Sequence, residues 1–405
     1  MKNIITLILA GGVGSRLGPL TASRSKPAVH FGGKYRIIDF MMSNCLNSGL
    51  YKIMALVQYR AQGLIDHLQD HWPSAPKFGF SVHTVPPQQM FGNEWYRGTA
   101  DAVYQNLPLV LRRGQFQTAA ILSGDQIFAM DFSQMYSFHK EKNAVFTVCT
   151  LSLPTAEAAG RFGVIEVDEH SKVIGFEEKP DHPKEIPGKP GRSFVSLGDY
   201  FADLSYLKQV LEENTQDPDT SHDFGRDIIP KLVRAGAPVY AYDFCDNQIP
   251  GQSEHYWRDV GTVHALWEAN MDLVSITPEL NVYNEAWPIL TPYDNLPPAK
   301  FTETHEHGCL VRSSAVSGGC IIQDSNLYKA VCGRKVRIYN SSIEESVLFS
   351  EVRVGERCLL RRVIVDRGVD IPSGTSIGVN LDADHARGLY VDESGIVVVP
   401  RHFEF

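Results

Sequence analysis

A glycine-rich segment near the N-terminus has the residue types needed to hold a phosphate group. It follows the apolar run Ile4–Ala10, which is typical of a buried strand. Its glycines and cations are Gly11, Gly12, Gly14, Arg16 and Lys26. Glycines let backbone N–H groups approach an anion closely, and the two cations could neutralise its charge. A tight turn is the alternative, because the segment fits neither the P-loop pattern GxxxxGK[ST] nor the dinucleotide-binding pattern GxGxxG.

Two aspartates could bind a metal ion or could serve only local structure. Asp125 follows the apolar run Ala119–Leu122, so it should project at the carboxyl end of a strand, where the active sites of α/β proteins lie. Asp259 stands in the segment YWRDVGT. The structural alternative for Asp125 is a turn or helix-cap carboxylate, and for Asp259 it is a salt bridge to Arg258. Neither aspartate identifies a metal site by itself.

The elements that would position these residues alternate between strands and helices up to roughly residue 270. Strand-like apolar runs occur at Ile4–Ala10, Ile53–Val57, Ala119–Leu122 and Ala144–Leu151. Strands separated by helices imply a mostly parallel, Rossmann-like sheet with both faces covered.

Local signals add two helices and a hairpin to this outline. Helical spacing follows Ala100, Val103, Leu107 and Leu111. We expect Pro108 to end or kink that helix, and we predict a second helix between a cap at Asp223 and a stop at Gly236. The runs Gly163–Val167 and Val173–Phe176 predict a two-strand hairpin.

The C-terminal part of the chain has a different pattern. Aliphatic residues recur at a six-residue step at Leu348, Val354 and Leu360, and after a shift at Ile371 and Ile377; a second row is Val352, Cys358 and Ile364. This pattern is typical of a left-handed parallel β-helix, and a small β-sandwich is the alternative. Proline-rich sequence precedes it. We therefore predict a catalytic domain over 1–283, a linker over 284–307 and a β-helix domain over 308–405.

Composition excludes some classes of protein. The formal net charge of −9 argues against a nucleic-acid-binding protein, which normally has a basic face. No apolar run approaches the roughly 20 residues that cross a bilayer, so we expect no membrane partner. The seven cysteines are scattered, without a CxxC pair, and free thiols in a reducing cytoplasm are the expectation.

The segment LILAGGVGSRLGPLTASRSKPAV, residues 7–29, resembles the signature GGxGxRLxPLTxxxxKP of sugar nucleotidyltransferases. The segments KPAVHFGGKYRIIDF, WYRGTADAV, SGDQIF, FEEKP, SHDFGRDIIP and YWRDVGT resemble the ADP-glucose pyrophosphorylase branch of that family. The resemblance spans the chain and implies transfer of the adenylyl group of ATP to glucose 1-phosphate, with release of pyrophosphate. Such a reaction joins two anions and depends mainly on positioning and charge neutralisation, for which Mg²⁺ is suited.

The resemblance also implies roles for single residues. The catalytic residues would be Arg16, Lys26 and Asp125, with Asp125 and Asp259 as magnesium ligands. The nucleotide would be held by Gly11, Gly12, Gly14, Gln88, Tyr96 and Gly98. The sugar phosphate would be held by Lys179 through its phosphate and by Glu178 and Ser196 through its sugar. Core packing is the alternative for Tyr96, and a solvated surface charge is the alternative for Lys179.

Several positions depart from the family pattern and leave alternatives open. Gln126 and Phe128 replace a histidine and a tyrosine, Ser23 replaces a lysine implicated in activation by sugar bisphosphates, and Pro87, Asp199 and Ala202 lie in base-side and sugar-side segments. A sister transferase for GTP or another hexose 1-phosphate, a non-catalytic regulatory subunit, and an acyltransferase working on the β-helix remain alternatives. We expect small-molecule effectors at the seam between the domains, with Arg36, Arg367 and Arg387 as possible anion contacts, and a homotetramer.

Overall fold

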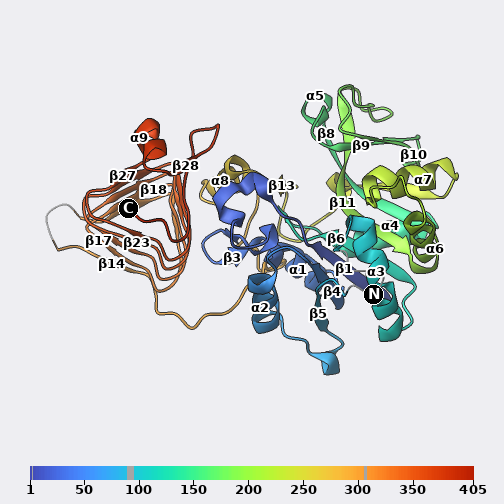
Figure 1. Ribbon diagram of the computed structural model, residues 1–405, viewed down its shortest axis with the longest axis horizontal. Helices are drawn as coiled ribbons and strands as arrows, with labels where there is room; N and C mark the ends of the chain where they lie inside the picture. The colour runs from blue at the N-terminus through green and yellow to red at the C-terminus, as the bar shows by residue number, and fades with distance from the viewer. Residues whose placement is uncertain (2, 89–94, 305–307) are drawn as a thin grey trace.

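Figure 1 shows a computed structural model of the chain, which describes residue 1 and residues 3–88, 95–304 and 308–405. A nine-stranded sheet with helices forms the larger domain, and a stack of short strands forms the smaller one. The sheet consists of β1 (Ile4–Ala10), β4 (Lys52–Val57), β5 (Ser81–Val85), β6 (Thr118–Ser123), β8 (Phe146–Pro154), β9 (Gly163–Val167), β10 (Val173–Glu178), β11 (Arg192–Asp203) and β12 (Val239–Asp243). The predicted strands are confirmed.

The strands of this sheet point mostly in one direction. Their order is β10-β9-β11-β6-β1-β4-β5, with β8 pairing with both β11 and β12. β1 is parallel to β4 and β6, whereas β11 is antiparallel to β6, β8 and β9. Since β10 is antiparallel to β9, and β4–β5 and β8–β12 are parallel pairs, β10 and β11 alone among these nine strands oppose the others.

Both faces of the sheet are buried, as expected of strands covered by helices on two sides. Along β1, Ile5 and Leu7 belong to one apolar core, and Ile4 and Ile8 belong to the other. The helices are α1 (Ile37–Asn47), α2 (Gln62–His71), α3 (Thr99–Arg113), α4 (Phe132–Glu141), α5 (Thr155–Ala158), α6 (Leu204–Thr215), α7 (Ile229–Arg234) and α8 (Val263–Asp272). Because both faces of β1 pack in apolar cores, the strand is rigidly positioned. The loop that follows it therefore begins at a fixed point at the edge of the sheet.

The structure corrects one detail of the first predicted helix and agrees with both ends of the second. α3 runs through Pro108 to Arg113, so the prediction that Pro108 ends it is wrong. Burial of Leu107 and Val110 in the core outweighs the unfavourable propensity of proline within a helix. Asp223 caps a turn, η4 (Phe224–Ile228), that continues into α7, and Gly236 follows with φ +70°. The predicted hairpin is confirmed as β9 and β10.

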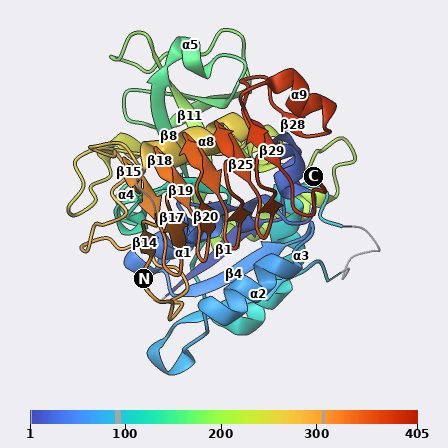
Figure 2. The same cartoon turned by 90° about the vertical axis from the view of Figure 1, so that its left-hand side faces the viewer.

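The smaller domain is the predicted left-handed parallel β-helix, and Figure 2 shows its stacked strands in front of the sheet domain. One side consists of β14 (Lys300–Thr302), β17 (Ile321–Gln323), β20 (Arg337–Tyr339), β23 (Arg353–Val354) and β26 (Asp370–Ile371). The second consists of β15 (Leu310–Arg312), β18 (Asn326–Tyr328), β21 (Ser342–Glu344), β24 (Leu359–Arg361) and β27 (Ser376–Ile377). The third consists of β16 (Ala315–Val316), β19 (Val331–Cys332), β22 (Val347–Leu348), β25 (Val363–Val365), β29 (Val397–Val399) and β28 (Tyr390–Val391).

The six-residue pattern places one aliphatic residue on each side of this β-helix. Leu348, Val354 and Leu360 lie on β22, β23 and β24, and all three are fully buried. Val354 pairs with Ile371 in the next coil, and Leu360 pairs with Ile377. Three parallel stacks of this kind exclude the β-sandwich alternative. A short helix, α9 (Leu381–Ala386), follows the last coil.

The segment between the domains packs against the sheet domain. Trp287 and Ile289 are buried, and the Trp287 indole donates a hydrogen bond to Asn44 Oδ1 of α1 (3.1 Å). The first β-helix strand, β14, lies within the range predicted as linker, and the domain boundaries stay a prediction. Within the described residues, no helix is both long and apolar enough to span a bilayer.

The two domains share one apolar core. It contains Leu17, Leu20 and Phe31 from the first segments of the chain together with Ile364, Ile396 and Val398 from the β-helix. The β-helix therefore packs directly against the segment that follows β1.

Candidate active site

The loop after β1 turns sharply at Gly14. This residue has φ +66° and precedes a 3₁₀ segment, η1 (Ser15–Thr21). A Cβ at Gly14 would lie 2.9 Å from Lys26 Cβ, so glycine is required both by the backbone conformation and by the close approach of Lys26. Lys26 begins a second short turn, η2 (Lys26–Ala28), and is almost fully buried beneath the loop.

Lys26 joins the two predicted metal ligands. Its Nζ donates hydrogen bonds to Asp125 Oδ2 (3.0 Å) and to Asp259 Oδ1 (2.8 Å). The two aspartates are far apart in the sequence and are brought together by β7 (Gln126–Phe128) and β13 (Trp257–Asp259), which pair antiparallel with Gln126 opposite Asp259. Asp125 Oδ1 also accepts a hydrogen bond from Ser123 Oγ (2.7 Å).

The charges in this cluster stabilise one another. Burial alone would lower the pKa of Lys26, but the charges of Asp125 and Asp259 outweigh it and raise the pKa above its ordinary value. Burial alone would raise the pKa of Asp125, but Lys26 and the hydrogen bond from Ser123 outweigh it and lower the pKa. At neutral pH the ammonium group and the Asp125 carboxylate are therefore both ionised.

Arg16 lies at the edge of the same cluster. Its Nη2 is 3.7 Å from Asp259 Oδ2, and its side chain is 69% exposed. Gly261 makes room for this approach, because a Cβ there would lie 2.8 Å from Arg16 Nη2. Arg16 is thus free to turn toward an anion that enters the site.

These residues face a cavity of about 580 Å³ at the carboxyl edge of the sheet. The predicted site residues that line it are Gly11, Gly12, Gly14, Arg16, Lys26, Tyr96, Gly98 and Asp125. Asp259 joins them through its ion pairs with Lys26 and Arg16. Both the glycine loop and Asp125 reach this edge because β1 and β6 are parallel neighbours, with Leu9 opposite Ser123.

The opposite wall of the cavity forms where α3 begins. Tyr96 donates its backbone N–H to Gln58 Oε1 (2.9 Å), and its hydroxyl accepts a hydrogen bond from Asn106 (2.9 Å). Gly98 touches the neighbouring chain so closely that a Cβ would lie 2.3 Å from the His222 carbonyl oxygen. Thr99 Oγ1 donates to Asp223 Oδ2 (3.0 Å), which ties α3 to the turn before α7.

Sequence reasoning missed some of the lining residues. These are, among others, Gln58, Thr99, Tyr200 and Asp223. Asp223 was recognised only as a helix cap, and it does cap η4, accepting hydrogen bonds from the N–H groups of Gly225 and Arg226. Asp223 and Thr99 lie in the segments SHDFGRDIIP and WYRGTADAV, which resemble family motifs. These motifs could therefore have indicated both residues as part of the site.

Besides Asp259, four predicted residues are not among those lining the cavity. Gln88 is exposed, and its amide donates to the Pro86 carbonyl (2.8 Å). Lys179 is exposed at the end of β10 with φ +52°, and its N–H donates to the Phe162 carbonyl (3.1 Å). Glu178 Oε1 is 3.8 Å from Arg226 Nη2. Ser196 Oγ accepts a long hydrogen bond from the Gly198 N–H (3.3 Å).

Asp199 points into the protein rather than into the cavity. It is fully buried, and its Oδ1 accepts a hydrogen bond from the Ser123 N–H (2.7 Å). Among the described residues, none supplies a hydrogen-bond partner for its Oδ2. Burial, together with the charge of Asp125, raises the pKa of Asp199 to about 8, against the effect of the hydrogen bond from Ser123. A neutral carboxylic acid therefore lies beneath the cluster at neutral pH.

The chain is similar to known proteins along nearly its whole length. A family model described as nucleotidyl transferase matches residues 5–275, and one described as a GlmU-like C-terminal hexapeptide domain matches residues 297–399. The chain is 46% identical over 403 residues to a protein of Alteromonas mediterranea, covering 99% of this chain and 92% of that protein. It is 46% identical to one of Aliivibrio fischeri (99% and 98% covered) and 48% identical to one of Enterobacter sp. (98% and 93% covered). All three relatives are named glucose-1-phosphate adenylyltransferase, and the chain belongs to this family of nucleotidyl transferases.

Proposed function

We propose that this protein transfers the adenylyl group of ATP to glucose 1-phosphate. A phosphate oxygen of glucose 1-phosphate attacks the α-phosphorus of ATP, the bond to the β-phosphate oxygen breaks, and ADP-glucose and pyrophosphate are the products. The observation that carries the proposal is the Lys26–Asp125–Asp259 cluster beneath the glycine loop, at one wall of a cavity large enough for a nucleotide. The names of the full-length relatives support the choice of ATP and glucose 1-phosphate.

The residues in this cavity suit a reaction between two anions. A sugar phosphate is ionised at neutral pH, so it needs no strong base to become a nucleophile. Backbone N–H groups of the loop at Gly11, Gly12 and Gly14 would hold phosphate oxygens, while Arg16 and Lys26 would neutralise the charge of the departing pyrophosphate. Catalysis in such a site comes mainly from alignment and from charge that is already in place.

The two aspartates fit a magnesium ion. Asp125 Oδ2 and Asp259 Oδ1 both lie within hydrogen-bond distance of a single cation, Lys26 Nζ, so the two oxygens converge on one centre. Within the described ranges, no group of three or more His, Cys, Asp or Glu could hold a metal ion. Two carboxylates suffice for Mg²⁺, which usually retains waters and completes its shell with substrate phosphates. When bound, the ion would neutralise phosphate charge.

We assign the sugar phosphate to the side of the cavity that Asp223 forms. Arg226 lies in the turn that Asp223 begins, and it is the partner of Glu178. Glu178 and Lys179 at the end of β10 are therefore close to this wall, and Lys179 would bind the phosphate. Ser196 is adjacent to the same region through its hydrogen bond with Tyr200, which lines the cavity. Gln88 stays our proposal for reading the adenine edge.

A pyrophosphate-release assay tests the proposed function. ATP, GTP, UTP and dTTP would each be combined with several sugar 1-phosphates in the presence of Mg²⁺. We expect ATP with glucose 1-phosphate to give the highest kcat/KM by a wide margin. A preference for GTP or for another hexose 1-phosphate would replace this substrate pair, and no turnover with any pair would favour a non-catalytic regulatory subunit.

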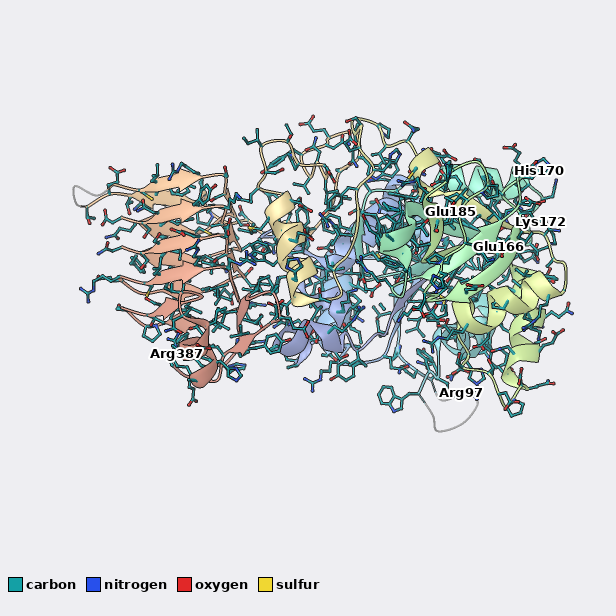
Figure 3. All side chains as sticks on the ribbon, turned by 90° about the horizontal axis from the view of Figure 1, so that it is seen from above. Arg97, Glu166, His170, Lys172, Glu185 and Arg387 are labelled. Carbon is teal, nitrogen blue, oxygen red and sulfur yellow. The ribbon has the colours of Figure 1, made fainter. Side chains whose placement is uncertain are left out.

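We further propose that an anionic effector binds at the seam between the domains. A cavity of about 500 Å³ lies there, and its basic lining residues include His30, Lys34, Arg36, Arg334 and Arg367. Burial and then the charges of Arg36, Arg24 and Arg367 lower the pKa of His30, as expected where the potential is strongly positive. Arg387, by contrast, pairs with Asp384 at the α9 end of the β-helix (Figure 3). Phosphate and sugar phosphates should change kcat or KM in the wild type, and Arg36→Gln should abolish that response.

The cysteines and the β-helix bear on location and assembly. The seven cysteines are all free in the described structure, which fits a reducing compartment, and we propose the cytoplasm.

We also propose a homotetramer, in which the β-helix serves assembly. Light scattering after gel filtration would measure the subunit number directly, and a monomer would contradict the proposal.

A further inference from the structure

A tyrosine of the β-helix lies against η1, the segment that follows the glycine loop. Gly18 interrupts η1 with φ +55° and ψ −128°, a conformation that favours glycine. The ring of Tyr390 on β28 covers this residue. A Cβ at Gly18 would lie 3.2 Å from Tyr390 Cζ and 3.4 Å from each of Cε1 and Cε2, so the ring faces the glycine.

In the sequence, Gly18 lies between the two cationic residues of the proposed active site. Arg16 precedes Gly18, and Lys26 follows it at the end of the same segment. The flanking residues Leu17 and Leu20 are fully buried in the core that also contains Ile396 and Val398 of the β-helix. The β-helix hairpin formed by β28 and β29 therefore supports the backbone that carries Arg16.

A buried ion pair holds the other part of this segment. Arg24 Nη1 and Nη2 donate to Asp366 Oδ1 (2.8 Å) and Oδ2 (3.0 Å), and both side chains are buried. Asp366 follows β25, and its N–H donates to Val399 of β29 (2.9 Å). The segment is thus attached to neighbouring β-helix strands at Gly18 and again at Arg24.

Arg16 itself has little else to position it. Its side chain is largely exposed, and its ion pair with Asp259 is long at 3.7 Å. Lys26, in contrast, is buried and makes two short hydrogen bonds. The direction of the Arg16 side chain consequently depends on the backbone at Leu17 and Gly18, which the β-helix holds.

We propose that Tyr390 is a positioning residue for adenylyl transfer, and that it acts through Gly18 on Arg16. The inference rests on the proposed function in assigning Arg16 to the departing pyrophosphate. It makes the β-helix a structural part of the active site, since one of its side chains holds the conformation of η1, the segment that carries Arg16.

A double-mutant cycle with Arg16 tests this coupling. Tyr390→Ala should lower kcat/KM for ATP roughly ten- to hundredfold, because displacement of a charged group by about 1 Å has effects of that size. Tyr390→Phe should retain most activity, since the ring makes the contact. In an Arg16→Ala background, Tyr390→Ala should change kcat/KM less than about twofold. If Tyr390→Ala lowered kcat/KM by the same factor in the Arg16→Ala background as in the wild type, the proposal would be overturned. Such a result would show that the substitution acts independently of Arg16.

Tyr328 provides a matched control. It also lies on a β-helix strand and is 42% exposed, compared with 39% for Tyr390. It is not among the residues lining the active-site cavity or the seam cavity. Tyr328→Ala should leave kcat/KM within about twofold of the wild type. An equal loss in both alanine variants would show that the effect is not specific to Gly18 and would overturn the proposal.

A second measurement does not depend on activity. Amide hydrogen exchange over residues 15–21 should become faster in Tyr390→Ala and stay unchanged in Tyr328→Ala. Unchanged exchange in Tyr390→Ala would refute the contact even in an inactive protein. Absence of turnover in the wild type with every substrate pair would refute the proposed function but not the Tyr390 contact. The hydrogen-exchange result would then decide whether Tyr390 holds η1.

Discussion

Replacement of the buried Asp199 by asparagine should stabilise the protein at alkaline pH and not at acidic pH. The raised pKa of Asp199, from 3.8 to about 8, means that folding takes up a proton at intermediate pH. Its contribution to stability is therefore most favourable below about pH 4 and is lost as the pH rises toward 8, because the unfolded chain binds fewer protons there. The asparagine side chain does not titrate, so the Asp199→Asn protein lacks this loss.

The magnitude follows from the shift. Each pKa unit corresponds to about 1.4 kcal/mol, so the cost of keeping Asp199 protonated reaches about 5–6 kcal/mol near pH 8 and is about 1–2 kcal/mol near pH 5. Asparagine can still accept the Ser123 hydrogen bond through Oδ1, but its Nδ2 replaces an oxygen that has no partner among the described residues. An unpaired buried donor costs about 1–3 kcal/mol at any pH. We expect a net gain of about 3–5 kcal/mol near pH 8.5 and a difference within about 1–2 kcal/mol near pH 5.

Calorimetric unfolding of both proteins across this pH range measures the difference. Asp203→Asn on the same strand is the matched control. Burial would raise the pKa of Asp203, but hydrogen bonds from Ser205 and Tyr206 outweigh it and lower the pKa. Its contribution to stability is present at neutral pH and lost at acidic pH, so the control has the opposite sign. A stability difference for Asp199→Asn that does not vary with pH would refute the reasoning.

Three further substitutions test the site. Asp125→Ala should lower kcat by at least about a hundredfold in a protein that still folds, with some loss of stability because Lys26 keeps only Asp259 as a carboxylate partner; a loss of kcat below about tenfold would contradict its proposed role. Lys179→Ala should mainly raise the half-saturation concentration of glucose 1-phosphate, by about tenfold or more, and an unchanged value in initial-rate kinetics would refute the assignment. Gly98→Ala should lower the unfolding midpoint and weaken ATP binding, because a Cβ would lie 2.3 Å from the His222 carbonyl oxygen. Gly63→Ala in α2, where a Cβ meets no atom within 4 Å, is the control and should be neutral or stabilising in the same calorimetric and binding assays.

Much of the fold could be predicted from the sequence because it depends on local periodicity. The apolar runs of the sheet and the six-residue rows of the β-helix occur where the sequence pattern indicates. The glycine loop could be predicted for a similar reason, since its glycines directly follow the apolar run of β1 in the sequence. These features need only neighbouring residues to be understood.

The cluster at the active site depends on long-range pairing, which the residues alone did not reveal. Asp125 and Asp259 meet because two three-residue strands, β7 and β13, pair with each other. Only the resemblance to a family suggested that the two aspartates act together. Strands this short have no periodicity from which their partner could be inferred.

The direction of Asp199 follows from its place on the strand and not from the family motif in which it stands. The pairing of β11 with β8 shifts register between Ser196 and Tyr200, and Gly198 has φ +79° within that irregularity. Ser196 pairs with Thr150 and Tyr200 pairs with Val148, so the shift adds an even number of residues and the alternation of side chains continues. Phe194 and Tyr200 accordingly belong to one apolar core, and Leu197 and Phe201 belong to the other. Asp199 alternates with Tyr200 and so points to the face of Leu197 and Phe201, whereas Tyr200 lines the cavity.

The apolar core that both domains share limits how this protein could be divided. Expression of residues 1–283 alone would leave Leu17, Leu20 and Phe31 without the β-helix residues that cover them. A fragment cut at the linker would expose a hydrophobic patch beside the segment that carries Arg16, so it should aggregate or lose activity. A β-helix taken from a relative should therefore support a folded, active protein only if it is exchanged together with the segment of the sheet domain that it contacts.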